Sequence, residues 1–301
     1  MKKKSRTAAT NLSLFLIALP GILYLLINNY APMLGIFLAF KNYSLMKGPF
    51  KSDWCGFDNF EFLFKTKDAW IMTRNTLLYN TAFIIIGTVA AILVAILMCE
   101  LGEKKRVKFY QAVMLLPNLL SWVVIGFIAY AFLNADTGFI NNTFLRWLGL
   151  DPVAWYSTPG AWPIILVIVN LWKNIGYQSI IFMAAISGID KSLFEAAAID
   201  GCRPAGTFFK IVMPISKTVY ATVFILDFVA HWNDFMWPFL VMTGEDKRTI
   251  QLAVQSFFGT QPVHYSAIMA ALVISAIPMI IMFIFMQKYY VEGIASSGIK
   301  G

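Results

Sequence analysis

Charge is scarce in this chain. Only 13% of its 301 residues are charged, 59% are hydrophobic, and the mean hydropathy is +0.68. A soluble domain of this length carries roughly twice that share of charge. Charge is wholly missing from four stretches, each longer than the ~20 residues that a membrane-spanning helix needs: 7–40, 75–99, 109–135 and 249–287. These runs predict an integral membrane protein.

The residue types that carry most catalytic and metal chemistry are also few. The chain has two histidines, and its three cysteines show no CxxC spacing. We therefore expect no metal site, no cofactor held by this chain and no membrane-embedded enzyme. The chain lacks a GxxxxGK[ST] phosphate-binding loop, so it is not expected to hydrolyse ATP itself. No basic stripe with interleaved aromatic residues suggests nucleic acid, and the net charge of +8 is assigned to the membrane surface.

The alternation of apolar runs and charged segments predicts an all-α polytopic membrane protein with six transmembrane helices. The spans are expected at about 12–34, 75–99, 109–133, 162–187, 217–240 and 264–287. The first uncharged run continues to Phe40, far past the core of a signal peptide, so we interpret it as an uncleaved first span. With six spans, the side that bears both termini has 14 Lys and Arg and the other side has 9. The positive-inside rule then places both termini in the cytoplasm.

The segment between the fourth and fifth spans has the pattern of two short helices joined by a turn. Residues 193–199 contain good helix formers and no breaker. Gly201 supplies a turn at little steric cost, because it has no Cβ. A second helix can begin after Pro204, a residue favoured in a first helical turn, and Pro214 limits it. Two helices on a loop between membrane spans suit the binding of another protein.

The spacing within this segment resembles the EAA loop of permease subunits of ATP-binding-cassette (ABC) importers. That loop has glutamate-alanine-alanine, a glycine four residues after the second alanine, and isoleucine-x-leucine-proline. Met213 in place of leucine is the one departure here. The resemblance implies cytoplasmic coupling helices that dock on a dimer of ABC ATPase subunits, which use ATP and Mg. The implied docking residues are Glu195, Ala196, Ala197, Asp200, Gly201, Ile211 and Pro214.

Two further stretches resemble carbohydrate-importer permeases. One is Gly56–Phe60, followed by Asn75–Thr76, and the other is His231–Phe235, together with the ending Glu292–Gly301. The resemblance implies a non-catalytic permease subunit of an ATP-driven sugar importer in the bacterial inner membrane. It also implies an extracytoplasmic solute-binding protein and a sister permease, in a heterodimer or a homodimer. The expected parts are the N-terminal segment, first span and external loop at 1–74, the five-span importer domain at 75–287 and a cytoplasmic tail at 288–301.

Two other functions remain open from the sequence. An importer permease for a non-sugar solute, such as a polyamine or phosphate, would share the loop but not the sugar-permease-like ends. An ion-coupled secondary transporter would use intramembrane acids, which Asp227 and Asp234 could supply, but it would leave the EAA-like loop unexplained.

Charged residues inside the predicted spans are candidates for a substrate path. A charge at the centre of a span costs ~2.5–3.5 kcal/mol, so such residues usually pair or face a cavity. Lys173 and Asp227 lie at depths that differ by about 3 Å, and we expect them to form a buried pair. Trp232, Asn233 and Asp234 combine an aromatic face with hydrogen-bonding groups, which suits a sugar. Interfacial anchors are expected at Trp155, Trp162 and Trp237.

Overall fold

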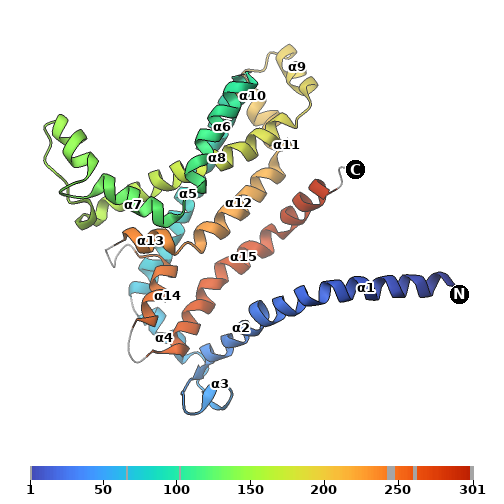
Figure 1. Cartoon of the computed structure of the whole chain (residues 1–301), viewed down its shortest axis with the longest axis vertical. Helices are drawn as coiled ribbons and strands as arrows, with labels where there is room; N and C mark the ends of the chain where they lie inside the picture. Colours follow the sequence, from blue (N-terminus) through green and yellow to red (C-terminus); the bar gives the residue numbers. More distant parts are fainter. Residues whose placement is uncertain (1, 66, 102, 243–247, 260–262, 299–301) are drawn as a thin grey trace. The chain divides into compact units, whose positions relative to one another are not determined.

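The structure is a computed structural model that describes residues 2–65, 67–101, 103–242, 248–259 and 263–298. Within those ranges it is helical apart from turns and one short antiparallel hairpin (Figure 1). The chain divides into two compact units. The first consists of Met1–Thr66 and Ser256–Ala276, and the second of Lys67–Gln255 and Ile277–Gly301.

The elements before residue 67 belong to the first unit. They are α1 (Lys2–Leu25), η1 (Leu26–Tyr30), α2 (Ala31–Met33), η2 (Leu34–Phe40), β1 (Lys41–Asn42), α3 (Gly48–Lys51), β2 (Asp53–Trp54) and α4 (Asp58–Lys65). The elements from residue 67 onward are α5 (Lys67–Glu100), α6 (Lys104–Leu119), α7 (Trp122–Leu133), η3 (Ile140–Leu145), η4 (Trp155–Ser157), η5 (Pro159–Ala161), α8 (Trp162–Ser187), α9 (Lys191–Ile199), α10 (Pro204–Thr207), η6 (Phe208–Val212), α11 (Met213–Ile215), α12 (Lys217–Trp232), α13 (Met236–Val241), α14 (Ile250–Phe258) and α15 (Tyr265–Gly298).

Four of the described helical segments are long and apolar enough to cross a membrane. They are Leu14–Phe40, Ala69–Glu100, Pro159–Ser187 and Tyr265–Lys288. Two bent pairs, α6 with α7 and Phe208–Ile215 with α12, would raise the number to six if each pair is one span. The prediction of a polytopic helical protein is confirmed at this level.

Two of the predicted spans differ in detail from the structure. The third, expected as one helix at 109–133, is two helices that meet at an angle of 95°. The fifth, expected at 217–240, stops at Trp232, and α13 begins at Met236 after a break. Both regions are apolar on average, and average hydrophobicity does not reveal where a helix breaks. The predicted tail at 288–301 is helical as far as Gly298, and residues 299–301 lie outside the described part.

In the first unit, the hairpin is held against the start of α15 by polar contacts. The Nδ2 atom of Asn59 donates to the carbonyl oxygens of Ala39 and Lys41, both at 2.9 Å. The hydroxyl of Ser266 donates to the carbonyl of Lys41 at 2.7 Å. Ala39 is fully buried, and it packs with Phe60 in a small apolar cluster. The hairpin is therefore an ordered part of this unit.

In the second unit, small residues let α5 pack on α8. Gly87, Ala91 and Ala95 are spaced by four, so they form one stripe along α5, and all three are buried. Small side chains allow membrane helices to approach closely and gain dispersion contacts. Ala91 and Ala95 pack with Phe182, and a Cβ on Gly87 would lie 3.2 Å from Oε1 of Gln178. The stripe therefore sets the register of α5 on α8.

A still closer approach joins α6 to α8, which run side by side (Figure 1). A Cβ added to Gly176 of α8 would lie only 2.0 Å from the carbonyl oxygen of Met114 in α6. Backbone atoms cannot swing away from such a clash, so only glycine fits at this position.

Two tryptophans that were expected as interfacial anchors are core residues instead. Trp162 is 1% exposed, and Trp237 is fully buried. Both belong to the largest apolar cluster of the second unit, together with Phe83, Ile125 and Leu166. The anchor prediction is wrong for these two, because the sequence shows that a tryptophan lies near a span end but not which way it faces.

Gly176→Ala should destabilise the protein by about 1–3 kcal/mol or more, the range for overpacking a well-filled interior. The measurement is the thermal unfolding midpoint in nanodiscs. Gly160→Ala is the matched control, because a Cβ there meets nothing within 4 Å. Equal midpoints for the two variants would show that α6 and α8 are not packed backbone to backbone.

Candidate functional site

Helix α9 forms the first half of the loop that was predicted to dock on an ATPase. Asp190 precedes it, and its Oδ1 atom accepts a hydrogen bond from the backbone N–H of Ser192 at 3.0 Å. This capping contact satisfies one of the N–H groups that a helix start leaves unpaired. It also lowers the pKa of Asp190 below its usual value, because the bond favours the ionised carboxylate. The helix starts two residues earlier than predicted and ends at Ile199, as predicted.

Gly201 ends α9 in a left-handed conformation, with φ of 71°. Its N–H donates to the carbonyl of Ala198 at 3.1 Å, and the N–H of Cys202 donates to the carbonyl of Ala197 at 2.9 Å. These two bonds form a Schellman motif, which satisfies the last carbonyls of the helix and favours glycine at this position. The predicted role of Gly201 as the turn residue is therefore seen in the backbone geometry.

The second half of the loop is helical from Pro204 to Ile215, through α10, η6 and α11. Pro204 is its first residue, where the missing N–H of proline costs nothing. The segment ends one residue after Pro214, and α12 leaves it at an angle of 66°. The predicted pair of short helices is present, and α9 to α11 directly connect α8 with α12 (Figure 1).

The predicted docking residues do not all face the same way. Exposed residues are Glu195, Ala196, Asp200, Gly201 and Pro214. Ala197 is buried and Ile211 is half-buried, so these two support the loop from inside. Ile199, which the sequence reasoning missed, is an apolar side chain that is 86% exposed. An isoleucine beside the exposed acids of a short helix is the signal that could have revealed it.

Lys173 contacts main-chain carbonyls and not the carboxylate of Asp227. Its ammonium donates to the carbonyl oxygens of Leu120 at 2.5 Å, Asn118 at 3.0 Å and Pro117 at 3.4 Å. The predicted Lys173–Asp227 pair is therefore wrong for the described structure. The depths do match, but two residues at one depth can face different neighbours around their helices.

Asp227 of α12 contacts Gln178 of α8, whose side-chain amide nitrogen Nε2 donates to Oδ2 of Asp227 at 2.7 Å. One turn further on, Nδ1 of His231 lies 2.7 Å from the carbonyl oxygen of Asp227, and Nε2 lies 2.9 Å from Nδ2 of Asn170. Because a carbonyl only accepts, Nδ1 carries the proton, and Nε2 accepts from Asn170. Polar contacts thus join α8 to α12 at two levels.

The sequence contains a signal for these contacts. Asn170, Asn174 and Gln178 are spaced by four in an otherwise apolar span, so they share one face of α8. Polar side chains on one face of a membrane helix usually meet a partner helix or a cavity.

The other proposed path residues lie at and beyond the end of α12. Trp232 is 1% exposed and stacks on Phe228 at 5.4 Å between ring centroids, which is a packing role. Asn233 is exposed. Asp234 accepts a hydrogen bond from the backbone N–H of Trp237 at 3.3 Å.

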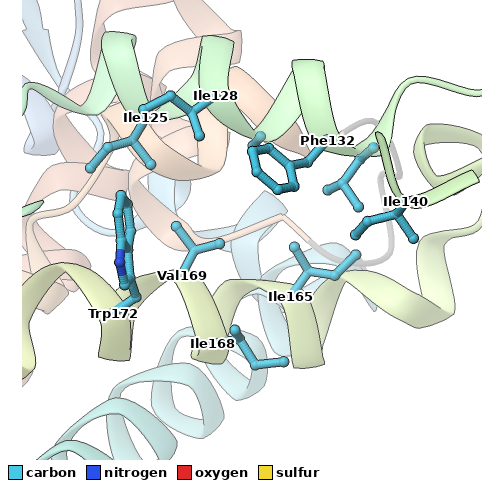
Figure 2. A pocket seen from close by; sticks show the side chains of 10 residues that line it. Ile125, Ile128, Phe132, Ile140, Ile165, Ile168, Val169 and Trp172 are labelled. Carbon is cyan, nitrogen blue, oxygen red and sulfur yellow. The ribbon is translucent and has the colours of Figure 1, made fainter. Parts of the chain in front are cut away.

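A cavity of about 450 Å³ lies between α7 and α8. Figure 2 shows side chains from both helices pointing into it, including Ile128, Phe132 and Ile165. Aliphatic and aromatic side chains line it, and they expose no polar atom to the cavity for the hydroxyl groups of a sugar. The cavity does not suit a polar substrate.

Comparison with known proteins gives a consistent family. Residues 87–296 match the model of the binding-protein-dependent transport system inner membrane component. Protein LplB of Bacillus subtilis (strain 168) is 30% identical over 79% of this chain and 74% of its own length. The polygalacturonan/rhamnogalacturonan transport system permease protein YteP of the same organism is 30% identical over 71% of this chain and 66% of its own.

A solved structure is consistent with the same family. The crystal structure of a bacterial ABC transporter involved in the import of the acidic polysaccharide alginate contains a chain that is similar at a TM-score of 0.83. That similarity has 26% sequence identity and covers 99% of this chain and 100% of the other. Together with the apolar helices and the loop between α8 and α12, these matches show that the chain belongs to the binding-protein-dependent transport system inner membrane component family, the multi-pass permease subunits of transporters.

Proposed function

We propose that this chain is a permease subunit of an ATP-driven sugar importer. The observation that carries the proposal is the exposed loop in which Glu195 lies on α9 and Gly201 fixes the turn, within a permease of the binding-protein-dependent family. A saccharide cargo is supported by the similarity to a polygalacturonan/rhamnogalacturonan permease and to an alginate importer. An oligosaccharide or a related glycoside is the substrate class that we propose.

The partners follow from this assignment. A dimer of ABC ATPase subunits would bind ATP and Mg, and would receive the α9–α11 loop on its surface. A sister permease, identical or different, would complete the membrane passage, and an extracytoplasmic binding protein would deliver the sugar. We place the chain as six spans with both termini in the cytoplasm, because Lys and Arg are more frequent on that side.

The loop suits the transmission of force. The capping contact at the start of α9 and the hydrogen-bonded turn at Gly201 make the loop an ordered structure and not a coil. Closure of the ATPase dimer would displace the loop, and the displacement would reach α8 on one side and α12 on the other. A rigid-body change of this kind would switch the passage between inward-open and outward-open states.

For the substrate path we propose the polar groups near the end of α12. Asp227, Asn233 and Asp234 offer acceptors to sugar hydroxyl groups, and the contact of Asp227 with Gln178 holds one of them in place. Lys173 and Trp232 are engaged by carbonyls and by ring stacking in this conformation. We therefore propose that these two residues support the walls of the path and do not bind the sugar directly.

Coupling is tested by Glu195→Ala and Gly201→Asp in the assembled transporter. Both should abolish uptake and transport-linked ATPase stimulation while membrane insertion stays intact. Glu195→Ala removes a contact of ~1–3 kcal/mol at the docking surface, and Gly201→Asp adds bulk and charge at a left-handed position. Glu100→Ala, an exposed acid outside the loop, is the control. Normal uptake with full ATPase stimulation in both loop variants would remove the loop from the mechanism.

Orientation is tested by labelling with a membrane-impermeant maleimide in intact cells. In a background where Cys55, Cys99 and Cys202 are serine, Phe57→Cys should react and Asp200→Cys should be protected. The reverse pattern would place the α9–α11 loop outside the cell and overturn the topology.

The contact between α8 and α12 is tested by a double-mutant cycle of Gln178→Ala and Asp227→Ala. Neighbours in direct contact show non-additive losses of about 0.5–3 kcal/mol, and the cycle should fall in that range. The measurement is the thermal unfolding midpoint in nanodiscs. The matched cycle of Lys173→Ala and Asp227→Ala should be close to additive. If the second cycle shows the larger coupling, the contacts of Asp227 are assigned wrongly.

A further inference from the structure

The break between α6 and α7 leaves backbone carbonyl groups at the end of α6 that need hydrogen-bond donors from elsewhere in the protein. Helix α6 ends at Leu119, α7 begins at Trp122, and their axes differ by 95°. The last carbonyls of a helix have no partner within that helix. Lipid offers no donor either, so a broken helix within a membrane needs donors from its neighbours.

Lys173 of α8 provides those donors. Its ammonium has three N–H groups and meets three carbonyl oxygens at the break, those of Asn118 and Leu120 and that of Pro117, which also accepts from the N–H of Leu120. It also lies 5.1 Å from the ring centroid of Trp122, the first residue of α7. A positive charge at the C-terminal end of a helix is favourable in addition, because the helix dipole is negative there.

Two more contacts join α6 to α8 around this lysine. Nδ2 of Asn118 donates to Oδ1 of Asn174 at 3.3 Å, and Gly176 lies against the backbone of Met114. On the other side of the break the packing is different. There α7 and α8 share an apolar cluster that includes Ile125 and Leu166, and a cavity of about 450 Å³ lies between the two helices (Figure 2). Helix α6 is thus held to α8 more tightly than α7 is.

We propose that Lys173 is a positioning residue that joins α6 to α8, so that these two helices move as one body during transport. Helix α7 is then the part that moves, about the break at Leu120–Ser121. The inference rests on the proposed function in one respect, since α8 leads into the α9–α11 loop, so any displacement of the loop would carry α6 with it.

The experiment uses the complete transporter in proteoliposomes, with all native cysteines of this chain replaced by serine. One pair, Asn118→Cys with Asn174→Cys, is joined across α6 and α8 by a short bifunctional thiol reagent. The matched pair, Ile128→Cys with Val169→Cys, is joined in the same way across the cavity between α7 and α8 (Figure 2). Uptake and ATP hydrolysis are measured for each, before and after cross-linking.

We expect the α6–α8 cross-link to leave uptake per ATP hydrolysed within about twofold of the uncross-linked protein, and the α7–α8 cross-link to stop uptake. Lys173→Met should lower uptake per ATP by about tenfold or more, the scale expected when a set of charge-assisted hydrogen bonds is lost. Lys173→Arg should retain much of the function, because it keeps the charge and the donors.

The decisive measurement is whether a cross-link between α6 and α8 restores uptake to the Lys173→Met variant. A cross-link between Asn118→Cys and Asn174→Cys should restore uptake to Lys173→Met, because a covalent bond replaces the lysine's contacts. A lysine that acts directly on the substrate would not be replaced in this way, so failure of the rescue overturns the proposal. If Lys173→Met does not assemble, the cross-linked pair with Lys173 intact still decides, since loss of its uptake would show that α6 and α8 separate. An uncross-linked transporter without ATP-driven uptake would instead count against the proposed function.

Discussion

The bilayer requires that every backbone N–H and C=O group within it be bonded inside the protein, and the rest of this structure depends on that constraint. It explains why the described chain is helical apart from turns and one two-residue-strand hairpin. It also explains why the break after α6 sits beside a lysine and not beside another apolar side chain. A charge that is costly in lipid becomes favourable when three carbonyls surround it, and the carbonyls of Asn118 and Leu120 gain a donor that lipid cannot give.

The same constraint bears on how a permease can move. Unbroken helices such as α5 and α8 pack closely through small residues, and they suit the role of a rigid frame. Broken segments are the places where one part can turn against another, provided that their exposed backbone groups stay bonded. In the second unit, the breaks lie after α6, before α12 and after α12. The α9–α11 loop connects directly to one of these, so displacement of the loop reaches a segment that is already bent.

Polar groups inside the second unit join its helices, and under the proposed function some of them would also contact the substrate. Gln178 and Asn170 join α8 to α12, while the carboxylates near the end of α12 offer acceptors that a sugar could use. The cavity between α7 and α8 has none of these groups. Volume alone therefore does not identify the passage of a polar solute, and the arrangement of hydrogen-bonding groups is the better guide.

The membrane class, the approximate place of the spans and the loop at Gly201 can all be predicted from the residues alone. Each of these depends on local chemistry: runs without charge, helix formers between breakers, and a glycine where a left-handed turn is needed. The limits of α8 were predicted to the residue, because its apolar run is bounded clearly on both sides. Three features become visible only in the folded chain: Lys173 contacts three carbonyls, Asp227 contacts Gln178, and Trp162 and Trp237 are buried. The reason is physical, since periodicity gives the depth of a residue in the membrane, whereas its neighbour depends on how each helix is rotated and where its partner breaks.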